Sequence, residues 1–316
     1  LIQVGPPFKF TDHDRRVVAR NRGDLFQTVD RVEVVLDQIE PIASTESGKG
    51  EIDIRLSDKI DSFMYVLGSL LSDGNSRMVA DANTASSRMG LVLGRSYEWS
   101  KEYGEGFSSH LRGIGINAER KEDRDYTEES SGYPSSGSYV WESEHSTLIT
   151  WMRRSCLGLD DSESKTYDAV KATWIVSAPE LWRKSFLQGL CDGDGCASLA
   201  SQYLSIATSA NEIFFMDLLK SFGMKSHVGD GAVVISARDS VIKSSALRLF
   251  RYASSRAENL AKLGDMMRTF DCRRGIEEEQ FLLIENLRTQ GYSWGSISEA
   301  IYDEYGYSWP YYTIMD

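Results

Sequence analysis

Apolar residues recur with helical spacing in two segments of the chain, and each segment ends in Asp-Gly. In residues 61–74 they lie three or four residues apart, as on one face of an α-helix, at Phe63, Val66, Leu67, Leu70 and Leu71. Residues 177–195 repeat the pattern after Pro179, which suits a first helical turn. The patterns predict helices that end at Asp73-Gly74 and Asp194-Gly195, where glycine commonly closes a helix.

A similar order of elements follows each of these helices. After the first helix, the sequence predicts strands over 76–82 and 88–94, a helix over 97–115, a loop over 119–138, a strand over 139–143 and a helix over 144–159. After the second, it predicts a strand over 202–209, a helix over 210–224, a hairpin over 225–237 and a helix over 238–250. A repeat this long indicates a duplicated domain with a pseudo-two-fold axis rather than a solenoid.

Further segments flank the repeat. An amphipathic helix is predicted over 25–39 and a linker over 43–51. Near the C-terminus, helices over 277–289 and 293–305 and the start of a third after Pro310 resemble a helix-turn-helix unit, although a helical hairpin packed on the preceding lobe fits equally well. The expected division is an N-terminal extension at 1–54, lobes at 55–160 and 161–265, and a helical unit at 276–316.

The two aspartates stand where folding alone disfavours them. A helix C-terminus is the negative end of the helix dipole, so a carboxylate there costs about 0.3–1 kcal/mol. Asp73 and Asp194 occupy matching positions of the repeat, which suggests that both face one cation with a preference for oxygen ligands, such as Mg²⁺. Gly68 and Gly189 lie in the middle of the same helices, where glycine lowers helix stability relative to alanine. A close approach of two helix backbones would explain why glycine stands at both positions.

Composition limits the kinds of protein that fit. The net charge of −12 argues against a protein that coats DNA through a wholly basic surface. Residues 121–180 contain six Lys/Arg and twelve Asp/Glu, whereas residues 181–250 contain seven and six, so a nucleic-acid site would be a local surface. No apolar run is long enough to cross a bilayer, no signal segment is evident, and the four cysteines lack zinc-site spacing. A soluble intracellular protein without membrane contact is expected.

The paired segments resemble a known family. "VLGSLLSDG" (66–74) and "LQGLCDGDG" (187–195) are similar to the two motifs of single-chain LAGLIDADG homing endonucleases. The second copy keeps L, G, L, D, D and G in place, whereas the first has Leu71 at the position of the inner acid. The flanking segments 90–99, 172–190 and 203–213 also resemble the family, so the similarity covers residues 60–260.

The resemblance implies an α+β fold with two duplicated lobes, whose motif helices pack at the pseudo-dyad and whose antiparallel sheets form a saddle on DNA. It implies a monomer that cuts a long asymmetric double-stranded DNA site for intron homing, leaves short 3′ overhangs and requires Mg²⁺, or Mn²⁺ or Ca²⁺ in its place. Carried over by position, Asp73 and Asp194 are the catalytic metal ligands with the Ser72 and Gly193 carbonyls, and Gly68 and Gly189 are packing positions.

Family members also place basic or amide side chains near the scissile phosphates. In the first half Arg95 stands at a strand end suited to this role, whereas the second half has Thr208 there. Lys225 and Arg238 are substitutes, and each of the three basic residues also fits an ordinary solvated side chain. Asp192 is expected to be structural or solvent-facing. Two alternatives keep the fold: a non-cleaving DNA-binding regulator, and a maturase that binds intron RNA.

Overall fold

A computed structural model describes residues 42–43, 52–53, 59–78, 87–121, 137–159, 163–270 and 275–315. The helix predicted over 25–39 lies outside these ranges, as do most of the predicted linker 43–51 and much of the predicted loop 119–138. Ahead of the first lobe, β1 (Ile42–Ala43) pairs antiparallel with β2 (Ile52–Asp53).

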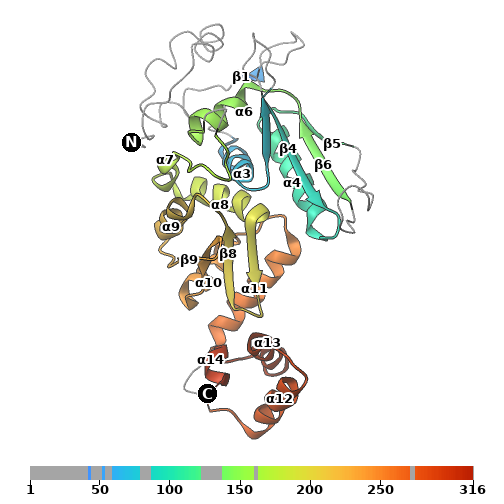
Figure 1. Cartoon of the computed structure of the whole chain (residues 1–316), viewed down its shortest axis with the longest axis vertical. Coiled ribbons are helices and arrows are strands. Elements are labelled where there is room, and N and C mark those ends of the chain that lie inside the picture. The colour runs from blue at the N-terminus through green and yellow to red at the C-terminus, as the bar shows by residue number, and fades with distance from the viewer. Residues whose placement is uncertain are drawn as a thin grey trace.

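The first lobe is a four-stranded antiparallel sheet with helices against it (Figure 1). Its elements are α3 (Ile60–Leu71), β3 (Asn75–Met78), β4 (Ser87–Gly94), α4 (Trp99–Gly113), β5 (Ala118–Arg120), β6 (Ser138–Ser143), α6 (Thr147–Trp151) and the π-helical turn η2 (Met152–Cys156). The strands lie in the order β3-β4-β6-β5. Side chains of β4 alternate, so Met89 and Leu91 are buried while Val92 is exposed, and the sheet therefore packs one face on the helices.

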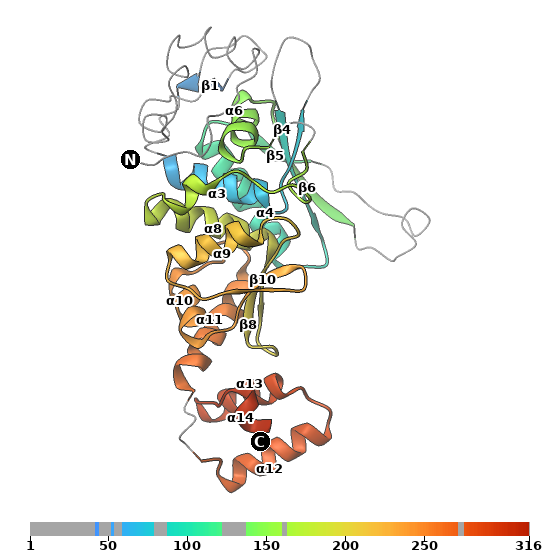
Figure 2. The same cartoon turned by 60° about the vertical axis from the view of Figure 1, so that its left-hand side comes forward.

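The second lobe has the same plan. Its elements are α7 (Thr173–Val176), α8 (Glu180–Asp194), β7 (Gly195–Ser198), β8 (Tyr203–Ala207), α9 (Glu212–Ser221), β9 (His227–Gly229), β10 (Ala232–Ile235), α10 (Arg238–Leu247) and α11 (Ser254–Thr269). Its strand order, β7-β8-β10-β9, is that of the first lobe. In Figure 2 the helices α8 to α11 lie on one side of this sheet. The predicted α+β fold with two duplicated lobes is confirmed.

Helices α3 and α8 pack against each other between the lobes, through their two mid-helix glycines. A Cβ at Gly68 would lie 2.0 Å from the Phe186 carbonyl oxygen, and one at Gly189 would lie 2.1 Å from that of Tyr65. The two contacts are equivalent, because a shift of 121 residues converts Tyr65 and Gly68 into Phe186 and Gly189. The pseudo-dyad therefore passes between these glycines, and the predicted close backbone approach is present.

Three local expectations differ from the structure. Residues 119 and 120 belong to β5 rather than to a loop, because Ala118–Arg120 pairs with the inner strand β6. The strand β7 directly follows Asp194 and had no counterpart among the predicted elements. Gly74 and Gly195 close their helices without a positive φ. They are needed for space, since a Cβ at Gly195 would lie 2.5 Å from the Cys191 carbonyl oxygen.

A C-terminal helical unit follows the second lobe. It consists of α12 (Glu278–Thr289), α13 (Trp294–Tyr305) and α14 (Tyr311–Met315) around its own apolar core, which includes Ile297, Ile301 and Trp309. Gly295 lies against the backbone of Ala200, where a Cβ would come within 1.6 Å of the carbonyl oxygen. Lys262 of α11 bridges to Glu299 and Asp303 at 2.8 Å each. The unit is thus packed on the second lobe at its β7–β8 turn. Across the described ranges, no helix has the length and apolarity to span a membrane.

Candidate functional site

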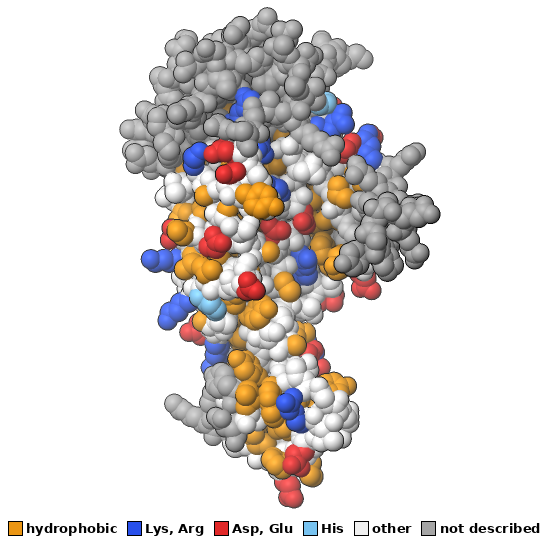
Figure 3. All heavy atoms as spheres, viewed as in Figure 1, with side chains coloured by type: hydrophobic (Ala, Val, Ile, Leu, Met, Phe, Trp, Pro, Cys, Tyr) orange, Lys and Arg blue, Asp and Glu red, His pale blue; other side chains and the backbone are white. Residues whose placement is uncertain are grey.

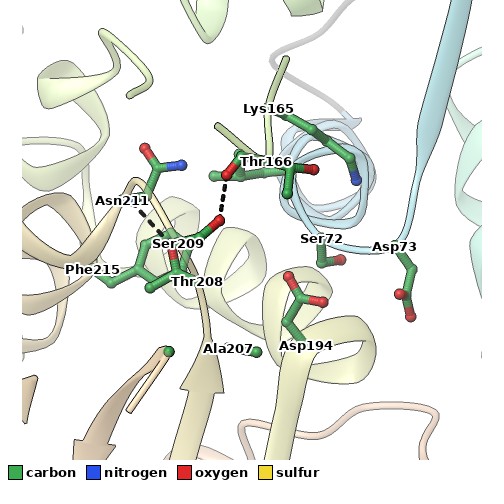
Figure 4. Close-up of a pocket in the computed structure, with 12 residues that line it drawn as sticks. Ser72, Asp73, Lys165, Thr166, Asp194, Ala207, Thr208, Ser209, Asn211 and Phe215 are labelled. Atoms are coloured by element: carbon green, nitrogen blue, oxygen red, sulfur yellow. Dashed lines mark hydrogen bonds between the residues drawn. The ribbon is translucent and has the colours of Figure 1, made fainter. Parts of the chain in front are cut away.

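The C-terminal ends of α3 and α8 meet at one cavity. Asp194 is the last residue of α8, and Asp73 stands two residues after the end of α3. A Cβ at Gly193 would lie 2.3 Å from the Ser72 hydroxyl oxygen and 3.1 Å from the Asp73 backbone nitrogen. The two motif ends therefore touch, and both aspartates line a cavity of about 460 Å³ (Figure 4). The structure brings together the two residues that the repeat pattern singled out.

The remaining walls of the cavity come from the end of α3, from the connection between the lobes and from the second lobe. They are formed by Leu71, Ser72, Lys165, Thr166, Ala207, Thr208, Ser209, Asn211, Phe215 and Gly231. Thr208 lies where the sequence placed it, at the end of β8, and supplies a hydroxyl but no charge. Ala207 at the end of β8 and Gly231 before β10 line the cavity, so this end of the second lobe's sheet borders the site of the two carboxylates.

Both carboxylates hold raised pKa values. Burial raises the pKa of Asp194 to about 7, the nearby Asp73 carboxylate adds to the rise, and Lys165 and Arg256 oppose it. Burial also raises the pKa of Asp73, against the attraction of Lys165 and then Arg256. Two half-buried carboxylates that repel each other gain free energy from a cation between them.

The donor set fits a hard divalent cation that keeps part of its water shell. Two carboxylates and neighbouring backbone carbonyls are oxygen ligands, and Mg²⁺ is commonly held by one or two carboxylates plus water. Within the described ranges no cluster of three or more His, Cys, Asp or Glu side chains suits a metal. Asp73 and Asp194 would therefore hold such an ion with water and main-chain oxygens.

Arg256 donates hydrogen bonds at one of the expected main-chain ligands. It lies in the first turn of α11, and its Nη1 donates to the carbonyl oxygens of Asp192 at 2.9 Å and Gly193 at 2.8 Å. Its guanidinium lies 3.7 Å from the ring centroid of Trp99, which fixes it by a cation–π contact. The Gly193 carbonyl, which the resemblance marked as a metal ligand, is thus a hydrogen-bond acceptor for Arg256.

Asp192 is structural rather than solvent-facing. Its buried carboxylate accepts hydrogen bonds from the Tyr65 hydroxyl at 2.7 Å and from three successive backbone N–H groups of residues 251–253 at 2.9 to 3.2 Å. Burial raises its pKa to about 6, and these hydrogen bonds oppose the rise. Asp192 therefore anchors the chain just before α11 and so determines where Arg256 lies.

The three basic residues suggested by the sequence do not line the cavity of the two aspartates. Arg95 follows β4 and lies over the Tyr139 ring at 5.7 Å. Arg238 donates through Nε and Nη2 to the carbonyl oxygens of Met267 and Arg268, so it caps the end of α11. Lys225 is exposed on the segment before β9.

Lys165 and Arg256 are the basic residues beside the aspartates, and sequence reasoning missed both. Lys165 lies in a polar connection between the lobes that looks like any solvated loop, so the sequence carries no signal for it. Arg256 carried a weak signal, because the apolar residues Leu260, Leu263 and Met267 behind it are spaced as in a helix.

The two sheets differ in positive charge, because the strands of the first lobe carry Arg77, Arg88 and Arg120. In the second lobe no charged residue stands in β7, β8, β9 or β10. In the first lobe Arg88 bridges to Glu142 at 3.4 Å, and Lys121 pairs with Glu119. On the face seen in Figure 3, Lys and Arg side chains are scattered among acidic and uncharged ones rather than gathered in one band.

Comparison with known proteins gave matches among solved structures. No family model and no curated protein matches the sequence. A mesophilic variant of the homing endonuclease I-DmoI has 15% identity and a TM-score of 0.44, covering 63% of this chain and 97% of its own. I-DmoI in complex with DNA and Ca has 14% identity and a TM-score of 0.43, covering 62% and 97%. The N-terminal LAGLIDADG domain of DUF199/WhiA has 13% identity and a TM-score of 0.35, covering 58% and 80%.

The chain resembles LAGLIDADG endonucleases in fold. This resemblance rests on the two motif helices packed through equivalent glycines and on two sheets of the same strand order.

Proposed function

We propose that this protein cleaves both strands of DNA with a divalent cation held between the motif helices. The observation that carries the proposal is the meeting of Asp73 and Asp194 at one cavity, from equivalent positions of a duplicated fold. An acidic pair at two helix C-termini is unfavourable for folding. Binding of a cation that takes part in the reaction is the simplest explanation for the presence of this acidic pair.

Each part of the site has a role in this reaction. Asp73 and Asp194 hold the ion, with the Ser72 carbonyl as a further oxygen ligand. A bound Mg²⁺ supplies a Lewis acid and activates water for attack on phosphorus. Arg256 holds the Gly193 end of the site in place through its two carbonyl contacts. Thr208 contributes a neutral hydroxyl to the cavity wall.

The exposed sheet faces are the proposed surface for duplex DNA. Structures of I-DmoI in complex with DNA and Ca, and with its target DNA in the presence of Mg, support this reading. Phosphates would replace Glu142 and Glu119 as partners of Arg88 and Lys121. Since exposed ion pairs contribute about 0–1 kcal/mol each, the exchange is easy.

The test uses a plasmid library with randomised inserts, incubated with the protein in Mg²⁺. We expect the wild-type protein to linearise a subset of plasmids. Asp73→Asn and Asp194→Asn should each abolish linearisation, because an amide lowers affinity for the ion. Asp217→Asn, which changes an exposed acid on α9, is the matched control and should cut normally. Full cutting by either site variant would refute the ligand assignment.

A non-cleaving DNA-binding protein is the second candidate. It is favoured by Arg256, whose cationic group already donates a hydrogen bond to the Gly193 carbonyl. This candidate predicts DNA binding that is independent of Mg²⁺ and no cutting by the wild-type protein. Tighter binding to structured intron RNA than to DNA would instead support a maturase.

A further inference from the structure

Lys165 reaches the acidic pair from outside both motif helices. Its side chain lines the same cavity as Asp73 and Asp194, and in Figure 4 its ammonium group lies on the side of Ser72 and Asp73. Within the described ranges, this ammonium makes no hydrogen bond and no ion pair within 4.0 Å. It is therefore a partly buried cation near two carboxylates that it does not contact.

The loop that carries Lys165 is firmly held. The Ser164 backbone N–H donates to the Asp168 carboxylate at 2.7 Å, and the Asp168 N–H donates to the Ser164 carbonyl at 2.8 Å. On either side of Lys165, the Ser209 hydroxyl donates to the Thr166 carbonyl and Arg153 donates to the Glu163 carbonyl. Lys165 is thus placed at the cavity by the backbone around it rather than by a partner for its charge.

A simple counter-ion would close on its carboxylate, as happens elsewhere in this molecule. Arg251 contacts Asp61 with two nitrogens, at 2.9 and 3.0 Å. Arg256, the other cation near the pair, donates to two carbonyl oxygens and stacks on Trp99. The space between Lys165 and the aspartates is therefore open to a ligand that carries negative charge.

We propose that Lys165 is a catalytic residue whose ammonium group contacts a non-bridging oxygen of the scissile phosphate. The proposal rests on the nuclease function proposed above. During hydrolysis, negative charge gathers on the phosphoryl oxygens as water adds to phosphorus and loses a proton to solvent. The P–O bond to the sugar breaks, and the sugar oxygen leaves with its electron pair and takes up a proton from solvent. Lys165 keeps its proton and donates hydrogen bonds to that charge, so it stabilises the transition state more than bound DNA.

The test compares Lys165→Met and Lys165→Arg with the wild-type protein on a duplex recovered from the library, or on a random duplex if none is recovered. Lys171→Met is the matched control, because this exposed lysine follows in the same connection and pairs with Glu163. Two quantities are measured: the single-turnover cutting rate in Mg²⁺, and the salt dependence of DNA binding in Ca²⁺. Melting temperatures verify that each variant is folded.

We expect Lys165→Met to lower the cutting rate about 10²- to 10³-fold. It should also reduce the slope of log K against log salt by about one, as loss of one phosphate contact requires. Lys165→Arg should retain part of the rate, and Lys171→Met should leave rate and slope unchanged.

A folded Lys165→Met protein with the wild-type slope overturns the proposal, and so does one with the wild-type cutting rate. Tighter Mn²⁺ binding by that variant, measured by electron paramagnetic resonance together with an unchanged slope, would show that Lys165 only neutralises the aspartates. If the wild-type protein binds DNA but cuts none, the nuclease function fails, and the slope still decides whether Lys165 touches phosphate.

Discussion

The three aspartates at the ends of the two motif helices lie in different environments, and these environments determine what each carboxylate can do. Asp73 and Asp194 face a cavity that admits solvent and ligands. Asp192, two residues before Asp194, accepts four hydrogen-bond donors in the interior. A buried carboxylate with every lone pair engaged holds structure, whereas a half-buried one with free lone pairs can bind an ion.

His110 makes stability depend on pH. Burial lowers its pKa to about 4, Arg251 lowers it further, and Asp61 opposes both. The neutral ring pairs with the Ser62 and Tyr252 hydroxyls at 2.9 and 3.0 Å. As pH falls from about 6.5 to about 4, His110 becomes protonated in the unfolded chain but stays neutral in the folded protein. We therefore expect the free energy of unfolding to fall by up to about 3 kcal/mol over this window.

The measurement is urea unfolding of the wild-type protein and of His110→Gln across that pH range. Only the difference between the two curves reports on His110, because the raised pKa of Asp192 acts in the opposite direction in both proteins. Parallel curves would mean that His110 is charged in the folded state.

Among residues, the sequence predicted those defined by the repeat and missed those defined by tertiary contacts. Asp73, Asp194, Gly68 and Gly189 stand at matching positions, so duplication itself revealed them. Lys165 approaches the aspartates only because a loop is fixed by Ser209 and Arg153. No local pattern records such an approach, and Arg238 could not be separated from a solvated arginine until its carbonyl partners were known.

At the scale of elements, the two motif helices form the central contact of the molecule. Each glycine faces a carbonyl oxygen of the other helix, so the helix backbones touch without intervening side chains. Because Asp73 and Asp194 follow directly from these helices, any separation of the helices also separates the aspartates.

Gly68→Ala and Gly189→Ala should each destabilise the protein by about 3 kcal/mol or more, since a methyl group at about 2 Å from a main-chain oxygen forces the helices apart. Thermal or urea unfolding measures the loss. Gly113→Ala is the control, because its added Cβ would lie 3.0 Å from the Ser62 hydroxyl and nearer to no other atom. A cost below about 1 kcal/mol for both motif variants would contradict the close packing.

Long elements could be predicted from periodicity, and short strands could not. Helices α4, α8 and α12 lie within a few residues of their predicted positions, because each carries several turns of apolar spacing. Strands β5 and β7 have three and four residues. Their strand conformation comes from pairing with β6 and β8, so it depends on residues distant in sequence.

At the scale of the whole molecule, the C-terminal unit is strongly acidic. Residues 275–315 contain one arginine and seven acidic residues. In Figure 2 this unit lies below the sheet of the second lobe and extends toward the side on which the sheets lie. Whether these helices bind DNA as a helix-turn-helix unit stays a prediction, and their charge opposes it.

Replacing Glu285 and Glu304, both exposed, by lysine should accelerate DNA association several-fold at low salt, because it weakens long-range repulsion of phosphates. Stopped-flow fluorescence with labelled duplex measures the rate. The acceleration should vanish at high salt, where charges are screened. An association rate insensitive to these substitutions at low salt would place the DNA far from the C-terminal unit.

The buried carboxylate of Asp192 is a structural difference between the two halves of the chain. Leu71 stands at the equivalent position of the first lobe, so the first lobe has no carboxylate there, whereas in the second lobe Asp192 holds residues 251–253 just before α11 and Arg256. A homodimer built from the second lobe would bury two such carboxylates at its axis, each without the Tyr65 hydroxyl it now accepts from. A homodimer built from the first lobe would have Leu71 at both positions and would contain no such carboxylate.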